Sequence, residues 1–215
     1  MITFGEELVL LALDDQKGTF INMSMVSFEY ALAGAILMDL ALMNRIDTDL
    51  ENLILINSDP TGDELFDCVL GMIAEVPDHK SSIFWVWEIR NRIENLRELM
   101  LDKLIAKGIL KKEEHKILWV FNQRHYPVID DREEVEVKTR IRALVLSDDI
   151  PQPRDIVLVS LINSCNLVDQ VFTREEQKKA YERIYQISRM NLIGQAVSKS
   201  INELQQLITS NVRMM

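Results

Sequence analysis

Apolar residues recur at helical spacing along most of the chain. Phe4, Leu8 and Leu11 predict a first helix that ends before Gly18. Residues 28–43 are nearly continuously apolar and rich in alanine. A helix that is apolar on most sides belongs in the middle of a core, where small residues let neighbouring helices approach closely. We therefore predict that residues 28–43 form the central helix.

Six further segments repeat apolar residues with a helical period. Five of them are residues 62–74, 130–146, 155–169, 174–189 and 192–208. The sixth is one long helix whose core-facing residues are Ile89, Ile93, Leu96 and Met100. Thr61 and Glu64 predict a capping box for the first of these. Gly108 is placed to end the long helix in a left-handed conformation.

Two apolar runs are too short for helices. Residues 117–121 read as a strand, residues 122–125 as its turn and residues 126–129 as the returning strand, which together predict a β-hairpin. The run 53–56 fits either a strand or a buried turn. The patterns together predict a mainly α fold: a single globular domain over residues 1–215, with about eight helices around a central apolar helix and one β-hairpin.

Composition supports one folded domain in a reducing compartment. A chain of 215 residues that is 47% apolar buries about 70% of its unfolded surface and needs no metal or disulfide. Cys68 and Cys165 both have apolar neighbours, so we expect buried, reduced thiols. The N-terminus lacks a basic secretory signal, and the longest apolar run, 30–38, is short of the roughly 20 residues of a spanning helix. We expect a cytoplasmic protein.

Charge is unevenly distributed along the sequence. The formal net charge of −10 opposes nonspecific binding to nucleic acid, so no nucleic-acid partner is expected. Residues 80–124, however, hold ten Lys or Arg and six Asp or Glu, a local sum of +4. Salt screens charges that lie more than about 8 Å apart, so a local basic patch can attract an anion although the net charge of the protein is negative. The segment is either a set of solvated helix faces or a basic surface.

No motif for catalysis, metal or cofactor binding is evident. His79, His115 and His125 lie far apart and have no metal-ligand spacing with the cysteines. The chain has no glycine-rich phosphate loop and no G-x-S-x-G nucleophile motif. We therefore expect a protein without a catalytic residue, a metal or a cofactor.

One charged cluster stands out. On a continuous helix, Arg90, Glu94 and Arg97 share a face. They form either a salt-bridge ladder at i,i+4 and i,i+3 spacing or an anion site, because guanidinium groups bind phosphate in a bidentate manner. The sequence leaves both interpretations open.

Several of these segments together resemble the Golgi phosphoprotein 3 family. The matching stretches are EELVLLAL (6–13), DQKG (15–18), ALAGAILMDLAL (31–42) with 45–46, PTGDELFD (60–67), NLRE (95–98) and KLIAKGIL (103–110), with a fainter match over 167–172. Each stretch is unspecific alone, but their order and spacing agree over most of the chain. The resemblance implies a helical domain with one β-hairpin.

The resemblance also implies a function. Eukaryotic members are non-catalytic peripheral proteins that bind phosphatidylinositol 4-phosphate on the cytoplasmic face of the Golgi and hold the cytoplasmic tails of glycosyltransferases. Their hairpin serves both membrane contact and self-association, which implies a homo-oligomer and assigns membrane contact to Arg124, Tyr126 and Val128. This chain begins close to the first predicted helix, without their long N-terminal tail. On that ground we expect a compact member of bacterial type.

The family's lipid site is only partly matched. Its tryptophan falls on Ser24, one arginine on Ala33, and the two arginines of the long helix on Glu94 and Arg97. Arg90, one turn before Glu94, is the candidate substitute, so we predict Arg97 and Arg90 as the lipid-binding residues. Trp85 and Trp87 are either substitutes for the lost tryptophan or core residues.

Three functions remain as hypotheses. The first is a peripheral membrane protein that binds phosphatidylinositol 4-phosphate or another anionic phospholipid headgroup. The alternative is a cytosolic interaction adaptor that keeps the fold, has lost the lipid and binds basic cytoplasmic tails of membrane proteins. The third, an enzyme, requires a pocket with converging polar groups.

Overall fold

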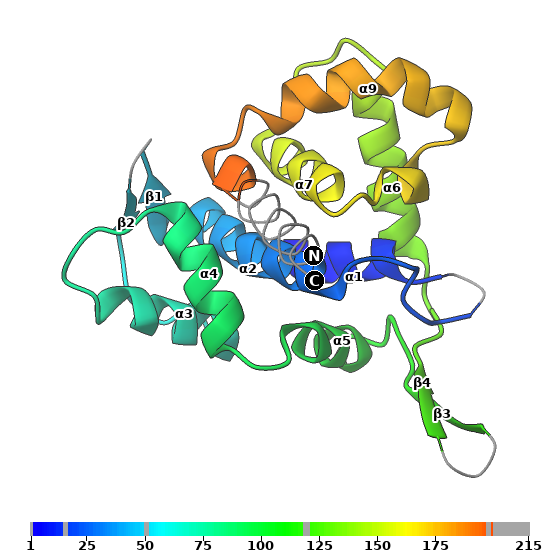
Figure 1. Cartoon of the computed structure of the whole chain (residues 1–215), viewed down its shortest axis with the longest axis horizontal. Coiled ribbons are helices and arrows are strands. Elements are labelled where there is room, and N and C mark those ends of the chain that lie inside the picture. Colours follow the sequence, from blue (N-terminus) through cyan, green and yellow to red (C-terminus); the bar gives the residue numbers. More distant parts are fainter. Residues whose placement is uncertain (1, 15–16, 50–51, 118–120, 197–198, 200–215) are drawn as a thin grey trace, which may run out of the picture.

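The computed structural model describes residues 2–14, 17–49, 52–117, 121–196 and 199, and it confirms a mainly α-helical single domain (Figure 1). The helices are α1 (Phe4–Ala12), α2 (Met25–Leu42), α3 (Glu64–Ala74), α4 (Ser82–Arg92), α5 (Leu96–Ala106), α6 (Arg132–Val145), α7 (Pro153–Ser164), α8 (Val168–Val171) and α9 (Arg174–Ser188). Residues 192–196 are also helical, and the rest of the predicted last helix, 200–208, lies outside the described residues.

α2 is the central helix, as the sequence predicts. It packs against α1, α4, α5 and α7, which surround it on several sides (Figure 1). By length and composition α2 could cross a membrane, but 72% of it is buried inside the domain. The neighbouring helices already cover this apolar surface, and burial in the core accounts for the composition of α2.

Three buried carboxylates, those of Glu6, Glu7 and Asp39, surround the N-terminus of α1. The Asp39 carboxylate comes from α2 and accepts a hydrogen bond of 3.0 Å from the backbone N–H of Phe4. The start of a helix favours such negative groups. Burial nevertheless raises the pKa of Asp39 to about 7, against the opposing effect of the Phe4 hydrogen bond. Asp39 therefore changes its charge near neutral pH.

Basic side chains from three other parts of the chain meet these carboxylates. The Nζ atom of Lys107, at the end of α5, lies 2.6 Å from Oε1 of Glu6. Arg154 on α7 and Arg140 on α6 place Nη2 atoms 2.9 and 3.2 Å from Oε1 of Glu7. Burial raises the pKa of Glu7, while Arg154 and Arg140 lower it. These ion pairs connect the first helix to α5, α6 and α7.

The strands form two small antiparallel sheets. β1 (Ile46–Thr48) pairs with β2 (Leu53–Leu55), so the run 53–56 contains a strand rather than a buried turn. β3 (Glu113–Ile117) pairs with β4 (Phe121–His125), and this hairpin projects from the domain beyond α5 (Figure 1). The predicted hairpin is present, and β1–β2 is an additional pair that the sequence analysis did not predict.

The boundaries of α3 and α7 differ from the prediction. Asp63, not Thr61, is the N-cap of α3, and its carboxylate accepts a hydrogen bond of 3.0 Å from the N–H of Leu65. The Thr61 hydroxyl instead donates to Asp67 over 2.6 Å, so the predicted capping box is wrong. The predicted helix over 155–169 is divided into α7 and α8 at Asn166, which has a positive φ of 57°. Asparagine tolerates this left-handed conformation better than most residues.

The base of the β3–β4 hairpin is attached to the loop after α1. The N–H of Tyr126 donates to the carbonyl oxygen of Gly18 over 2.6 Å. Gly18 has a positive φ of 60°, and a Cβ atom there would lie 2.8 Å from the backbone nitrogen of Pro127. The hairpin base therefore requires a residue without a side chain at this position.

Replacing Gly18 by alanine should lower the free energy of unfolding by about 2–3 kcal/mol, because left-handed strain and a backbone clash both act. Gly62 is the matched control, since its φ is also positive (86°) but nothing lies within 4 Å of its Cβ position. Gly62→Ala should cost only about 1 kcal/mol. Chemical denaturation of both variants tests this, and equal losses would contradict the role given to the Pro127 contact.

Candidate functional site

Arg90 and Arg97 lie on two helices rather than on one. α4 ends at Arg92, and Asn95 adopts a left-handed conformation with φ 58° immediately before α5. Glu94 lies exposed in the turn between them. The predicted common helical face of Arg90, Glu94 and Arg97 is therefore wrong, and the salt-bridge ladder through Glu94 does not form. Arg90 pairs with Glu29 and Arg97 with Glu98 instead.

The tertiary fold nevertheless brings the two arginines to the beginning of α2. Nη1 of Arg97 lies 3.2 Å from the sulfur of Met25, and Nη2 of Arg90 donates to Oε2 of Glu29 over 3.0 Å. Met25 and Glu29 are one helical turn apart, about 6 Å along the axis. We call Arg90, Arg97 and this first part of α2, from Ser24 to Glu29, the Arg90–Arg97 surface.

Arg97 is held by an aromatic ring and a carboxylate. Its guanidinium carbon lies 5.3 Å from the centroid of the Phe20 ring, and two of its nitrogens donate to Glu98. At this distance the ring attracts the guanidinium charge through a cation–π interaction. Phe20 was not among the predicted site residues, because it lies far from Arg97 in the sequence and belongs to no motif that we recognised.

Arg90, whose side chain is about as exposed as that of Arg97, contacts an aromatic ring of α2. Its guanidinium carbon is 5.8 Å from the centroid of the Tyr30 ring, and its Nε is buried without a hydrogen-bond acceptor among the described residues. Burial raises the pKa of Tyr30, and the charge of Arg90 opposes that shift. Arg90 thus has an unused donor and a partly buried charge.

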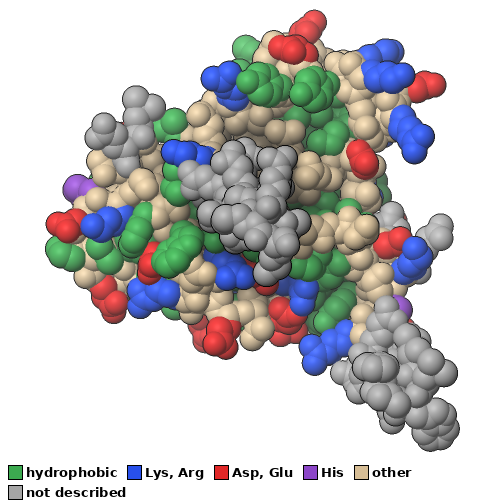
Figure 2. Space-filling model, in the orientation of Figure 1, with side chains coloured by type: hydrophobic (Ala, Val, Ile, Leu, Met, Phe, Trp, Pro, Cys, Tyr) green, Lys and Arg blue, Asp and Glu red, His purple; other side chains and the backbone are tan. Residues whose placement is uncertain are grey.

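Carboxylates balance the charge of the Arg90–Arg97 surface. Glu29 and Glu98 each bind one of the two guanidinium groups, and Glu94 adds a negative charge in the turn. On the face drawn in Figure 2, acidic and basic side chains likewise alternate along the lower edge of the domain. A phosphate group that binds here must compete with Glu29 and Glu98 for the same donors.

The hairpin residues lie elsewhere than predicted. Strand β4 occupies the predicted turn, with Arg124 exposed and opposite Glu114 of β3. Tyr126 is only 8% exposed, and Val128 forms a bridge with Leu110 at the hairpin base. The predicted turn at 122–125 is therefore wrong, and the burial of Tyr126 keeps its ring away from any surface that the hairpin contacts. Membrane contact through Arg124 stays a prediction.

The sequence of the whole domain identifies its relatives. The family model described as Golgi phosphoprotein 3 (GPP34) matches residues 4–204. The chain belongs to the Golgi phosphoprotein 3 family. A curated relative is the vacuolar protein sorting-associated protein 74 of Eremothecium gossypii, which is 26% identical over 214 residues. That alignment covers 83% of this chain and 63% of the relative, so the chain spans less than two thirds of the relative's length.

Within this Golgi phosphoprotein 3 family member, the positions carried over from the resemblance have different environments. Ser24 is the N-cap of α2 and accepts from the N–H of Ser27 over 3.3 Å. Ala33 is fully buried in the core, so it presents nothing to a ligand. Trp85 is a core residue at 1% exposure, whereas Trp87 is 51% exposed, three residues before Arg90. Arg97 alone keeps the charge that the family site implies.

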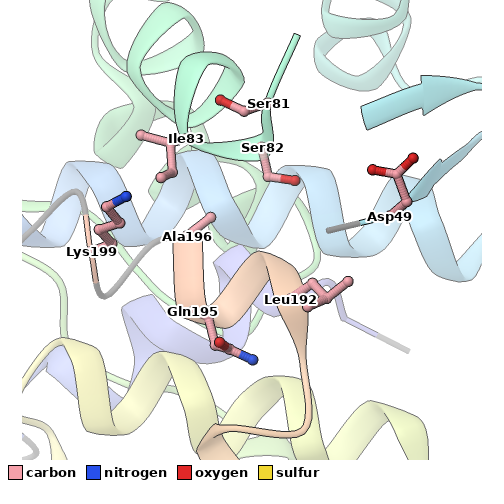
Figure 3. Close-up of a pocket in the computed structure, with 8 residues that line it drawn as sticks. All are labelled: Asp49, Ser81, Ser82, Ile83, Leu192, Gln195, Ala196 and Lys199. Atoms are coloured by element: carbon pink, nitrogen blue, oxygen red, sulfur yellow. The ribbon is translucent and has the colours of Figure 1, made fainter. Parts of the chain in front are cut away.

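A separate pocket of about 370 Å³ lies between α4, β1–β2 and the C-terminal segment (Figure 3). Its lining residues are Asp49, Ser81, Ser82, Ile83, Leu192, Gln195, Ala196 and Lys199. The Ser81 hydroxyl caps α4 by accepting from Phe84, and the Ser82 hydroxyl bonds Thr48 over 3.0 Å. Because the fold already uses these hydroxyls, the pocket offers a ligand few free polar groups.

The cysteines and potential metal ligands add no further site in the described part of the chain. Within residues 2–14, 17–49, 52–117, 121–196 and 199, no three His, Cys, Asp or Glu side chains gather as a metal site requires. Cys165 is buried, and burial raises the pKa of its thiol. Cys68 is exposed on α3, so the prediction of a buried thiol is wrong there, because Cys68 falls on the solvent side of that helix.

Proposed function

We propose that this protein is a non-catalytic peripheral protein that binds the phosphate groups of an anionic phospholipid at the Arg90–Arg97 surface. The observation that carries the proposal is the convergence of two guanidinium groups, from α4 and α5, on the first turns of α2. Guanidinium groups bind phosphate strongly, and the beginning of a helix favours an anion. Phosphatidylinositol 4-phosphate is the headgroup that the family resemblance implies.

Membership of the Golgi phosphoprotein 3 family supports this proposal. The Eremothecium relative is named for vacuolar protein sorting. From the family and the name of this relative we infer only that the protein acts at the cytoplasmic face of a membrane. Self-association through the β3–β4 hairpin, which the resemblance implies, stays a prediction.

The carboxylates predict weak, salt-dependent binding. A phosphate must replace Glu29 at Arg90 and Glu98 at Arg97, both of which are partly buried pairs. Surface attraction contributes about 1 kcal/mol for each basic side chain near an anionic bilayer. Screening by salt should therefore reduce the affinity steeply.

Arg97→Glu should reduce binding to vesicles containing phosphatidylinositol 4-phosphate about tenfold, because it reverses a charge at the centre of the surface. Co-sedimentation with these vesicles, and with vesicles of other anionic lipids, measures the change. Lys179→Glu is the matched control, since Lys179 is exposed on α9 at the opposite end of the domain (Figure 1). Equal loss in both variants, or none in Arg97→Glu, would contradict the proposal.

A second variant tests the competition directly. Glu98→Gln removes the carboxylate that binds Arg97 and should strengthen vesicle binding. Soluble inositol phosphate added as a competitor separates recognition of the headgroup from attraction to a charged bilayer. Thermal melting of each variant excludes loss of the fold as the cause.

The alternative function is a cytosolic adaptor for basic protein tails. The observation that favours it is that both arginines already have carboxylate partners, which leaves the surface without free positive charge. A net charge of −10 also favours basic partners. If wild type and Glu98→Gln both fail to bind any anionic vesicle, the adaptor becomes the better proposal.

A further inference from the structure

The outward face of α9 carries a surface feature that the proposed lipid site does not use. Ala180, Ile184 and Ile187 are the buried residues of this helix, and α9 packs chiefly on α7. The opposite side of α9 therefore faces solvent. Its composition is not what solubility alone requires, because two tyrosines are exposed there: Tyr181 at 72% and Tyr185 at 48%.

These tyrosines lie in a row with three cations. The row, which we call the α9 stripe, consists of Arg174, Lys178, Tyr181, Tyr185 and Arg189, all exposed. Successive members are separated by four, three, four and four residues, so they follow one line along the helix surface. The stripe runs the whole length of α9.

None of the three cations has an anionic partner among the described residues. Arg174 and Lys178 form no ion pair with any described residue, whereas Arg142 nearby pairs with Glu176. Arg189 lies with its guanidinium carbon 5.5 Å from the Tyr185 ring centroid and donates to the Tyr185 hydroxyl over 3.2 Å. Tyrosine and arginine are among the residues that contribute most at protein interfaces.

We propose that the α9 stripe binds an acidic segment of a partner protein. Carboxylates of the segment would pair with Arg174, Lys178 and Arg189, and its apolar side chains would cover Tyr181 and Tyr185. Charge complementarity carries this choice, because a row of cations in a protein of net charge −10 attracts acidic chains locally. The proposal does not depend on lipid binding.

The geometry argues against other occupants. Figure 1 shows α9 at the opposite end of the domain from α5 and the β3–β4 hairpin, so a membrane that contacts those elements does not reach α9. The exposed side chains of Glu175 and Glu182 border the stripe along one side. A surface one helix wide with an acidic border suits a single protein segment better than the broad phosphate array of a nucleic acid.

Fluorescence anisotropy with a defined probe tests the proposal. The probe is a labelled peptide of the length of α9 that alternates glutamate with leucine and phenylalanine, and its counterpart carries lysine in place of glutamate. At physiological salt the full-length protein should bind the acidic peptide and not the basic one. The double variant Tyr181→Ser/Tyr185→Ser should weaken binding about tenfold.

Two neighbouring lysines supply the matched control. Lys178→Glu lies in the stripe and should weaken binding about fivefold. Lys179→Glu makes the same charge change about 100° further round the helix and should leave binding nearly unchanged. Equal losses, no binding of the acidic peptide, or tighter binding of oligothymidylate than of the peptide would each overturn the proposal. Melting curves of the variants test whether each remains folded.

Discussion

Replacing Arg154 by methionine should lower the free energy of unfolding by about 3–5 kcal/mol. Arg154 donates to Oε1 of Glu7 over 2.9 Å and to the carbonyl oxygen of Ile2 over 2.8 Å. Glu7 is only 3% exposed, and its Oε2 atom has no hydrogen-bond partner among the described residues. Without Arg154, this carboxylate keeps only Arg140 to compensate its burial. Urea denaturation measures the loss.

A double variant tests whether the loss of stability comes from the buried Glu7 charge that Arg154 no longer neutralises. Glu7→Gln/Arg154→Met removes both charges and should regain most of the lost stability, because a neutral buried pair carries a smaller desolvation cost. Arg132→Met is the surface control, since the Arg132 side chain that pairs with Asp130 is 86% exposed, and its loss should leave stability nearly unchanged. If Arg154→Met is as mild as Arg132→Met, the buried pair does not stabilise α1.

Replacing Asp39 by asparagine should stabilise the protein above neutral pH. Burial raises the pKa of Asp39 to about 7, well above the value of 3.8 for an unperturbed carboxyl, so the folded state binds a proton that the unfolded state has lost. Stability therefore falls as pH rises from about 4 to 7, by roughly 4 kcal/mol for a shift of this size. Asparagine cannot ionise, and its carbonyl oxygen can still accept the Phe4 hydrogen bond.

The difference in unfolding free energy between Asp39→Asn and wild type, measured from pH 4 to 8, checks this prediction. The difference should be small near pH 4 and should increase in favour of the variant up to about pH 7. Asp67→Asn should behave oppositely, because hydrogen bonds from Thr61 lower the pKa of Asp67. That carboxylate stabilises the fold at neutral pH and loses its effect in acid. Parallel curves for Asp39→Asn and wild type would refute the role of Asp39.

The sequence predicted the central helix well because its signal is local and redundant. A run of apolar and small residues over 28–43 has few alternatives to a buried helix, and α2 is found at Met25–Leu42. The predicted first helix is also present as α1, and Glu6 and Glu7 lie in its first turn. Their partners were not predictable, because Lys107, Arg140 and Arg154 reach them only through the tertiary fold.

The break between α4 and α5 was missed because nothing in the apolar pattern marks it. Ile89, Ile93, Leu96 and Met100 keep helical spacing across the break, and neither glycine nor proline interrupts them. The available signal was Asn95, since asparagine adopts the left-handed conformation more readily than most residues. The hairpin register was missed for a related reason: β3 is mostly charged, and strands that project from a domain need no apolar face.

The candidate site was also only partly predictable from the sequence. Arg90 and Arg97 were selected from a supposed single helix, which was wrong, yet the fold places both beside α2. Glu29, the partner of Arg90, lies 61 positions away and carried no signal in the sequence. Such long-range contacts determine which cations are already paired with carboxylates. A basic residue that is paired in this way is less available to bind a phosphate.

The position of α1 also has a consequence for synthesis of the chain. Glu7 bonds to residues 133 and 147 positions later, so α1 cannot complete its packing until most of the domain has left the ribosome. At about 5–20 residues per second, this interval is roughly 7–30 s. During that time α1 lacks its contacts with α6 and α7, although α2 follows it closely in the chain. The side of α1 that α6 and α7 later cover therefore stays accessible to chaperones until those two helices have been made.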